Sequence, residues 1–481
     1  MASSFGGINT ALTSLYAQRR GLDVAGQNIA NANTEGYTRQ KVRMAAQTGT
    51  LHPGIYTTAD QVGSGVSVAG VERSRNSYLE ERGRIEHGNS AYLASQKASY
   101  QQIESVLAEP SDTALQARMH DMWDAWNDVA NNWQDPSTRT ALIERSKTVA
   151  ITLNDTHGAL SNQFEALSNQ TVGYVDQVNK LAAGIADMNR QVAVATQANL
   201  PANELQDERD RRVMELSRLV GATAQAKPSG SINVYVGSTA LVEDFTARSL
   251  EPSGPTTLDG ITATDKVSLK WTDTGIDATP GGTLGAMLDT MNTVIPGIVS
   301  DLDKVAAKIA DTVNLALTGD GTLAHPPGYT ENGTPGTPMF TGTTAKSLTV
   351  VIDNPADIAF SRGNPTPDPL DPTAPPAALD HDVADDLADV GTSGAGPDSD
   401  YQALIGRLGV SAQAASRRSE IQDAVRDQVD TSREAESGVN LDEEMTNLLT
   451  YQRGYEAASR VLTTIDAMLD QLINRTGLVG R

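Results

Sequence analysis

Hydrophobic residues recur every seven positions at both ends of the 481-residue chain. The N-terminal series is Ile8, Leu15, Leu22 and Ile29, with Ala11, Ala25 and Ala32 on the same stripe. The C-terminal series is Leu441, Leu448, Tyr455, Leu462 and Leu469, with Tyr451, Ala458, Ile465 and Leu472 three positions further on. This spacing is typical of helices that pack side by side at shallow angles. Either segment alone could be one amphipathic helix on a globular core, but two such series favour a coiled-coil-like pair.

Start and stop signals bound these two helices. Asn440 is a good N-cap, and Glu443 follows it three positions later, so the C-terminal helix should begin there and run to about Asn474. The N-terminal helix should end near Asn33, with Gly36 as a left-handed residue after it. The stretch "NIANANTEGYTRQ", residues 28–40, is therefore a chemical site, a binding edge or only the end of a helix.

The spacing of the hydrophobic residues changes in the middle of the chain. Spacings of three and four predict helices through about residue 221, including a face with Met119, Trp123, Trp126 and Trp133. Alternating apolar residues then predict strands in "SINVYVG", "KVSLKW" and "SLTVVID". We expect a helical hairpin over residues 281–317, broken at Pro296, and a mobile loop over the proline- and aspartate-rich residues 361–400. Helix resumes near residue 402.

These elements predict a mainly α protein with a β-rich insert, elongated and built from nested domains. The terminal segments 1–40 and 441–481 would form a coiled-coil-like inner-core domain. Residues 41–225, 281–320 and 401–440 would form a helical-bundle middle domain. Residues 226–280 and 321–400 would form a β-rich outer domain.

The composition excludes several classes of function. The formal net charge is −23, and a field of that sign repels nucleic acid and anionic membranes. The chain has no cysteine, which excludes disulfides and thiolate chemistry and would suit export in an unfolded state. No stretch approaches the length of a membrane span, and the N-terminus lacks the pattern of a cleaved signal peptide.

No catalytic constellation emerges from the sequence. The six histidines lack metal-ligand spacing, and no phosphate-binding or zinc-protease motif occurs. The charged run from Glu204 to Arg212 should be a solvated helix face with ion pairs one turn apart. The acidic run Asp382, Asp385, Asp386 and Asp389 could bind calcium weakly, but it lacks an ordered ligand loop. We therefore expect no enzymatic activity, no cofactor and no metal.

Both ends resemble one family. The stretch "LDVAGQNIANANTEGYTRQKV" is similar to the N-terminal signature of bacterial flagellar rod, hook and hook-associated proteins, although many relatives have proline where this chain has Glu35. The stretch "SGVNLDEEMTNLLTYQRGYEAASRVLTTIDAMLDQLIN" resembles the C-terminal segment of the family. Two internal stretches, "NELQDERDRRVMELSRLVGA" and "GGTLGAMLDTMNTVIPGIVSDLDKVAAKIADTVN", resemble the branch at the hook–filament junction.

The resemblance implies a structural axial subunit that joins hook to filament. Such a subunit is extracellular and is exported through the flagellar type III apparatus without a cleaved signal. Its partners would be copies of itself in a ring, the hook protein, the second junction protein (hook-associated protein 3) and an export chaperone at the C-terminal helix. Subunit packing would use the heptad residues above together with Asn31, Tyr37 and Arg39. Tyr37 and Arg39 could equally brace the subunit's own fold.

Three alternatives remain open from the sequence. The chain could be another axial protein, namely hook protein, distal rod protein or the second junction protein. It could instead be an exported adhesin or effector whose activity lies in the β-rich insert. An enzyme in that insert would need a convergent cluster of polar residues, and the sequence shows none.

Overall fold

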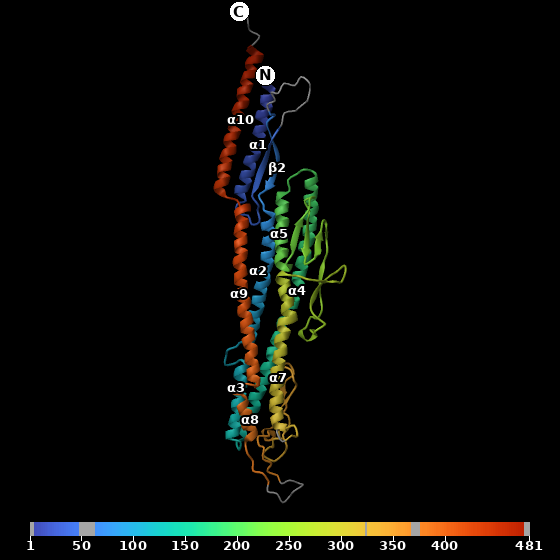
Figure 1. The fold of residues 1–481 in the computed structure, drawn as a ribbon, viewed down its shortest axis with the longest axis vertical. Coiled ribbons are helices and arrows are strands. Elements are labelled where there is room, and N and C mark those ends of the chain that lie inside the picture. Colours follow the sequence, from blue (N-terminus) through green and yellow to red (C-terminus); the bar gives the residue numbers. More distant parts are fainter. Residues whose placement is uncertain (1–3, 48–62, 323–324, 367–375, 476–481) are drawn as a thin grey trace, which may run out of the picture. The chain divides into compact units, whose positions relative to one another are not determined.

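The computed structural model describes residues 4–47, 63–322, 325–366 and 376–475. Its helices are α1 (Ser4–Ala30), α2 (Ser77–Leu107), α3 (Leu115–Asn131), α4 (Pro136–Gln197), α5 (Asn203–Val220), α6 (Gly282–Asp289), α7 (Ile295–Thr318), α8 (Asp382–Val390), α9 (Pro397–Ser437) and α10 (Leu441–Arg475) (Figure 1). The strands form four small antiparallel sheets. They are β1 (Gln40–Ala46) with β2 (Val66–Arg73), then β3 (Thr223–Ala226), β4 (Ile232–Val236), β5 (Thr239–Glu243) and β6 (Thr246–Ala247), then β7 (Leu250–Ser253), β8 (Ser268–Trp271) and β9 (Asp277–Ala278), and β10 (Phe340–Thr341) with β11 (Thr349–Val350).

The chain divides into two compact units. Unit 1 contains residues 1–88, 179–249 and 423–481, and unit 2 contains residues 89–178 and 250–422. The predicted mainly α fold with small β segments is confirmed. The β segments are distributed over both units, since β3–β6 belong to unit 1 and β7–β11 to unit 2. The three-domain division remains a prediction.

In unit 1, α1 and α10 pack against each other as an antiparallel pair (Figure 1). A Cβ atom added to Gly21 would lie 2.7 Å from the ring of Tyr451, and one added to Gly454 would lie 2.8 Å from the side chain of Gln18. Real Cβ contacts are longer, so these two glycines are what allows the backbones to approach so closely. Ala11, Ala17, Ala25 and Ala458 are buried along the pair. The predicted terminal pair is confirmed, and its centre is a stripe of small residues.

The start of the predicted helical middle domain contains a hairpin instead. Strands β1 and β2 pair antiparallel, with an irregularity between Arg43 and Met44, and both contact α1. Val42 and Met44 alternate with Lys41 and Arg43, but this alternation was too short to predict a strand. Helix α1 also ends at Ala30, three residues before the predicted stop, whereas Gly36 has the expected left-handed conformation with φ of 78°.

Asparagine side chains on helices hold the strand segments through pairs of hydrogen bonds to their backbone. The side chain of Asn189 on α4 is fully buried and bonds to the backbone N–H and C=O of Ile232 at 3.1 and 2.7 Å. In unit 2, Asn292 bonds to both backbone groups of Val267, and Asn314 bonds to both backbone groups of Phe340. A carboxamide carries one acceptor and a donor in the same geometry as a peptide group, so each asparagine substitutes for a neighbouring strand.

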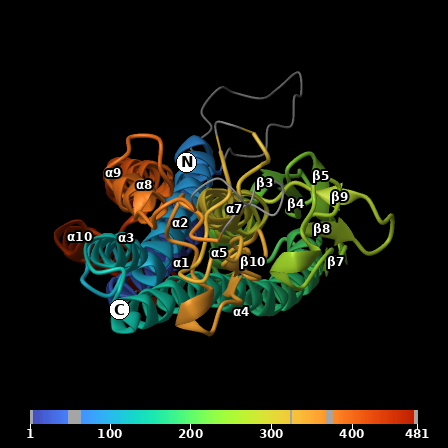
Figure 2. The same cartoon turned by 90° about the horizontal axis from the view of Figure 1, so that it is seen from below.

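The structure of unit 2 shows that two of the sequence predictions were wrong. The acidic half of the predicted loop 361–400 forms α8, which buries Val383, Ala384 and Leu387 against the tryptophan face of α3. The predicted hairpin over residues 281–317 does not reverse direction. A π-helical turn, Thr290–Val294, links α6 to α7 just before Pro296, whose missing N–H a regular turn would need. Figure 2 shows β7, β8 and β9 side by side in this unit.

The paired hydrogen bonds from an asparagine side chain to a strand backbone, which we call an asparagine clamp, can be tested at Asn189. Replacing Asn189 with Ala would leave the buried backbone groups of Ile232 without partners, so we expect the free energy of unfolding to fall by about 2–4 kcal/mol. Asn127→Ala is the matched control, because Asn127 is exposed on α3. The measurement is urea unfolding followed by circular dichroism. Equal midpoints for the two variants would contradict a clamp.

Candidate functional site: the joint below the terminal helices

The stretch from Asn28 to Gln40 folds around one buried side chain. Asn28 is fully buried at the C-terminal end of α1. Its amide nitrogen donates to the carbonyl of Gln40 at 2.9 Å and to Glu444 at 3.0 Å. Its amide oxygen accepts from the Tyr37 hydroxyl at 2.8 Å and from the Gln40 N–H at 3.0 Å. All four hydrogen-bonding positions of the carboxamide are therefore filled.

Arg39 fastens the same stretch to the start of α10. Its guanidinium pairs with Glu443 at 2.6 Å and with the buried Glu444 at 2.7 Å. Its backbone N–H donates to the carbonyl of Ser437 at the end of α9. Asn440 caps α10 as predicted, since its side chain accepts from the N–H groups of Asp442 and Glu443. We call the set Asn28, Tyr37, Arg39, Gln40, Glu443 and Glu444 the terminal joint.

Helix α5 holds the terminal joint from a third side. Asp207 accepts the backbone N–H of Thr38 at 3.0 Å, and Glu204 accepts the Gln40 side chain at 3.2 Å. Asn203 donates to Gln40 at 3.0 Å and to the carbonyl of Val71 on β2 at 3.1 Å. The joint thus ties together residues from the N-terminus, the middle and the C-terminus of the chain.

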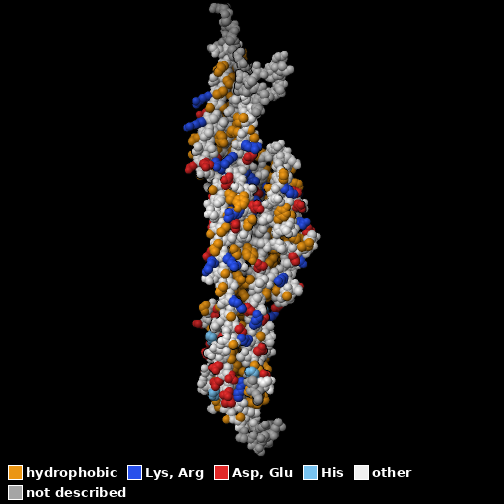
Figure 3. All heavy atoms as spheres, viewed as in Figure 1, with side chains coloured by type: hydrophobic (Ala, Val, Ile, Leu, Met, Phe, Trp, Pro, Cys, Tyr) orange, Lys and Arg blue, Asp and Glu red, His pale blue; other side chains and the backbone are white. Residues whose placement is uncertain are grey.

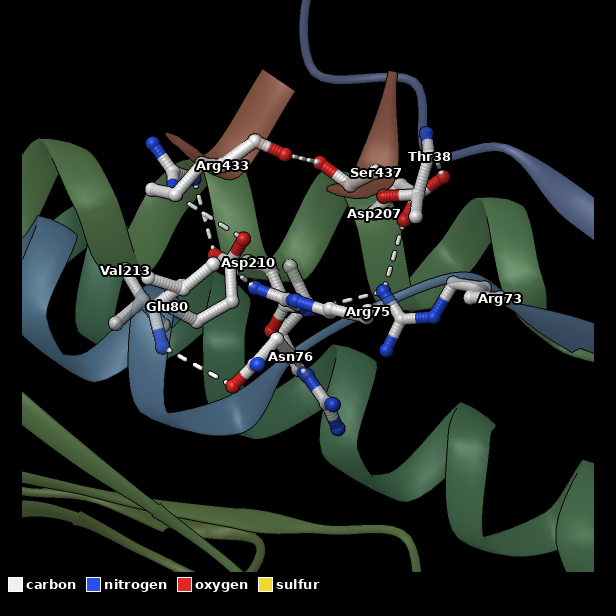
Figure 4. Close-up of polar contacts among 12 residues, drawn as sticks. Thr38, Arg73, Arg75, Asn76, Glu80, Asp207, Asp210, Val213, Arg433 and Ser437 are labelled. Atoms are coloured by element: carbon white, nitrogen blue, oxygen red, sulfur yellow. Dashed lines mark hydrogen bonds and ion pairs between the residues drawn. The ribbon is translucent and has the colours of Figure 1, made fainter. Parts of the chain in front are cut away.

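A second ionic layer lies beside the joint (Figure 4). Arg73 pairs with Asp207 at 2.8 Å and with Asp210 at 2.9 Å. Arg75 pairs with Asp210 and with Glu80, the latter at 2.6 Å. Arg433 on α9 completes the layer, with its guanidinium 3.0 Å from the carboxylate of Glu80. We call Arg73, Arg75, Glu80, Asp207, Asp210 and Arg433 the ionic layer.

Burial and neighbouring charges together shift the pKa values of this region. Burial alone would raise the pKa of Glu80, but Arg75 and Arg433 outweigh it and hold that pKa at about 2. Burial lowers the pKa of Arg209 to about 9 and that of Arg84 to about 10, with neighbouring arginines adding to the effect. Burial, followed by the carboxylates Glu204, Asp207 and Glu444, raises the pKa of Tyr37 to about 12, so its hydroxyl remains a donor.

The charged run on α5 was only partly predicted correctly. Glu208, Arg211 and Arg212 do form ion pairs one turn apart on a partly exposed face. Asp207 and Asp210, expected on a solvated face, are instead buried against Arg73 and Arg75, which lie at and just after the end of β2. The signal for this contact was the basic pair at residues 73 and 75, which periodicity alone could not connect to α5.

The predicted packing residues fall into two groups. Tyr451 and Ile465 lie against Gly21 and Gly7 of α1, inside the helix pair. The remaining heptad residues flank that stripe, where Ile8, Leu15, Leu22, Ile29, Leu448, Leu462 and Leu469 are half-buried and Leu441 and Tyr455 are exposed. Asn31 caps the carbonyl of Gln27 and is half-buried. The side chain of Leu472 lies outside the described residues.

The flanks leave apolar surface uncovered on the terminal pair. Leu12, Leu441, Met445, Leu449, Tyr455, Val461 and Met468 are all more than one-third exposed. Figure 3 shows hydrophobic side chains at the surface along this pair. Exposed apolar side chains gathered on one pair of helices make this pair the candidate interaction face of the chain.

Other candidate features have no comparable organisation. The acidic run places His381, Asp382 and Asp385 within reach of one another, but all three are exposed, and Asp386 pairs with Arg362. Among the described helices, none has the length and apolar character needed to cross a bilayer.

Comparison with known proteins agrees with this geometry. A family model of the flagellar hook-associated protein FlgK helical domain matches residues 100–340. Models of the flagella basal body rod protein and of the flagellar basal body rod FlgEFG protein C-terminal segment match residues 8–38 and 433–475. These ranges contain most of α1, all of α10, and Asn28, Tyr37, Glu443 and Glu444 of the terminal joint. The terminal pair and its joint therefore define a structural protein of the flagellar axis.

Individual relatives identify the family. Flagellar hook-associated protein 1 of Bacillus subtilis (strain 168) is 30% identical over the full length of both chains. The protein of that name from Escherichia coli (strain K12) is 26% identical, covering 97% of this chain and 99% of its own. The fold is also similar to the structure of the flagellar hook junction protein FlgK from Burkholderia pseudomallei, with a TM-score of 0.60, 14% identity, and coverage of 74% of this chain and 99% of that chain.

The chain belongs to the family of flagellar hook-associated protein 1, also called FlgK. It is a structural protein of the flagellar hook–filament junction and not an enzyme. The predicted family, fold class and function are thereby confirmed.

Glu80 gives the ionic layer a pH signature. Because its folded pKa of about 2 lies below the ordinary value of 4.5, Glu80 stabilises the fold above pH 4.5. That contribution, up to about 3 kcal/mol, is lost as the pH falls from 4.5 towards 2. We expect Glu80→Gln to have a flatter stability profile over this pH range than the parent.

The control is the exposed neighbour, Glu81→Gln, which should keep the parental slope. The measurement is the free energy of unfolding from urea titrations between pH 5 and pH 2.5. A Glu80→Gln profile parallel to that of the parent would contradict the ionic layer.

Proposed function

We propose that this chain assembles into the flagellum through the terminal helix pair, in a ring of copies that joins the hook to the filament. The observation that carries the proposal is the apolar surface of α1 and α10 that stays exposed among the described residues, namely Leu12, Leu441, Met445, Leu449, Tyr455, Val461 and Met468. Burying a side chain of this size stabilises an assembly by about 1.5–3 kcal/mol, so several flanking leucines together favour association strongly.

The packing residues of the proposal are the heptad residues on the flanks of the terminal pair. Ile8, Leu15, Leu22, Ile29, Leu441, Leu448, Tyr455, Leu462 and Leu469 would meet neighbouring subunits. Tyr37 and Arg39 make their observed contacts within the chain, to Asn28, Glu443 and Glu444. We therefore assign them to bracing the subunit's own fold, one of the two roles that the sequence left open.

The proposed partners follow from the position proposed for this chain in the flagellar axis. We propose that the chain contacts the hook protein on one side and the second junction protein, hook-associated protein 3, on the other. An export chaperone would cover the C-terminal helix before assembly, because its exposed apolar residues would otherwise associate prematurely. The absence of cysteine suits passage as an unfolded chain to the extracellular flagellum.

Leu462→Asp tests the flank. A carboxylate at this half-buried position would become buried at the subunit contact, which is strongly unfavourable without a partner. We expect far-UV circular dichroism close to that of the parent and no incorporation into flagella. Thr463→Asp, at the exposed neighbouring position, is the control and should be incorporated. Normal swimming of the Leu462→Asp strain would argue against the flank.

Deletion of the gene tests the place in the axis. We expect hooks without filaments by electron microscopy, and unassembled flagellin in the medium, because filament subunits would have no junction on which to assemble. Intact filaments in the deletion strain would reject the junction role.

A further inference from the structure

A polar groove of about 1160 Å³ lies beside the terminal joint in unit 1. One wall is the loop Asn33–Tyr37 together with the outer side of α5, and the other is the segment Glu434–Glu443 at the α9–α10 break. The two stretches that carry the sequence resemblance at either end of the chain thus face each other across one groove. We call it the joint groove.

The floor and the mouth of the joint groove differ in charge. The floor consists of Arg75, Glu80, Asp210 and Arg433, which already pair with one another. Two exposed arginines also line the groove, but Arg211 pairs with Glu208 and Arg218 bonds to His87. At the mouth, Glu434 and Asp442 are exposed, and within the described residues neither carboxylate has a hydrogen bond or ion pair. Leu441, 49% exposed, lies next to Asp442. The mouth therefore fits a cation that is flanked by apolar side chains.

The same chain carries a face of that kind. On α1, Leu12, Leu15, Arg19 and Leu22 follow a spacing of three and four and share one side of the helix. Leu12 and Arg19 are exposed, and Leu15 and Leu22 are half-buried. No ion pair of Arg19 occurs among the residues that the structure describes. We call these four residues the Arg19 face.

The Arg19 face cannot reach the groove of its own chain. Gln18 contacts Gly454, so Arg19 lies level with Arg453 on the antiparallel partner helix. Arg453 is eleven positions from Asp442 along α10, a separation of about 16 Å at 1.5 Å per residue. A contact between the two complementary surfaces therefore requires a second copy.

We propose that the joint groove of one copy receives the Arg19 face of a second copy, with Arg19 paired to Asp442 and Glu434. This inference rests on the proposed self-assembly through the terminal pair. The two surfaces differ, so each copy can bind one neighbour with its groove and another with its α1, as rings and helical assemblies require. Neighbouring copies are then offset along the helix axis by about 16 Å.

Site-directed crosslinking tests the contact, because the chain has no cysteine of its own. The double variant Arg19→Cys with Asp442→Cys is expressed in the source bacterium, flagella are isolated, and the junction fraction is oxidised. We expect a ladder of disulfide-linked multimers on non-reducing gels. A bridge within one chain is excluded, since disulfides join Cα atoms about 4.4–6.8 Å apart.

The matched control is Arg453→Cys with Asp442→Cys, which places the cysteine at the same level but on the other helix. It should remain monomeric. Incorporation of the Arg19→Cys, Asp442→Cys variant without multimers, or equal multimers in the control, overturns the proposal. Absence of the parent chain from isolated flagella would overturn the proposed function instead.

Charge exchange provides a second test that does not depend on disulfide geometry. Arg19→Asp and Asp442→Arg should each reduce the amount of chain recovered in flagella, because each variant places like charges together. Combining the two substitutions restores the pair and should restore incorporation. Failure of the double variant to recover above the single variants, when all three are folded by circular dichroism, overturns the pairing.

Discussion

The close approach of α1 and α10 is the constraint on which unit 1 depends. Gly21 lies under the ring of Tyr451, and Gly454 lies against Gln18, so larger residues at these positions would push the helices apart. The antiparallel register that results brings Asn28 to Glu444 and Arg39 to Glu443. In the same arrangement, the larger leucine side chains lie on the two flanks of the helix pair. Small residues inside therefore determine both the buried joint and the exposed apolar surface.

The terminal joint is polar. Its burial therefore requires a partner for every hydrogen-bonding group, and this requirement makes the pairing of the terminal helices specific. Burying Asn28, Glu444 and Asp207 is costly unless each hydrogen-bonding group has a partner, and here the partners come from three distant segments of the chain. A register shift of one residue in α10 would leave Glu444 without Asn28 and Arg39. The joint thus opposes alternative pairings of the terminal helices, which a purely apolar contact between two leucine-rich helices would tolerate.

The sequence predicted the elements better than it predicted their contacts. Heptad spacing located both terminal helices, Asn440 was the predicted cap of α10, and Gly36 was the predicted left-handed residue. A search for large apolar residues could not find the stripe through Gly21 and Gly454, because close packing there relies on missing side chains.

Other differences have similar causes. Helix α8 was hidden in an acidic, proline-rich stretch, and it is stabilised by only three buried side chains on the tryptophan face of α3. Asp207 and Asp210 look like surface residues on a highly charged helix, and only the fold brings Arg73 and Arg75 to them. Contacts between segments more than a hundred positions apart leave no periodic trace in a single sequence.

The most direct test of the account is a disulfide across the terminal pair. The register places Ser14 opposite Ala458, and the cysteine-free chain allows Ser14→Cys and Ala458→Cys to be introduced without competing thiols. Mass spectrometry of the oxidised, full-length double variant should show an intramolecular disulfide, whereas Ser14→Cys with Ala457→Cys, one position out of register, should form much less. Equal bridging in the two variants, or none in either, would contradict the close antiparallel pairing.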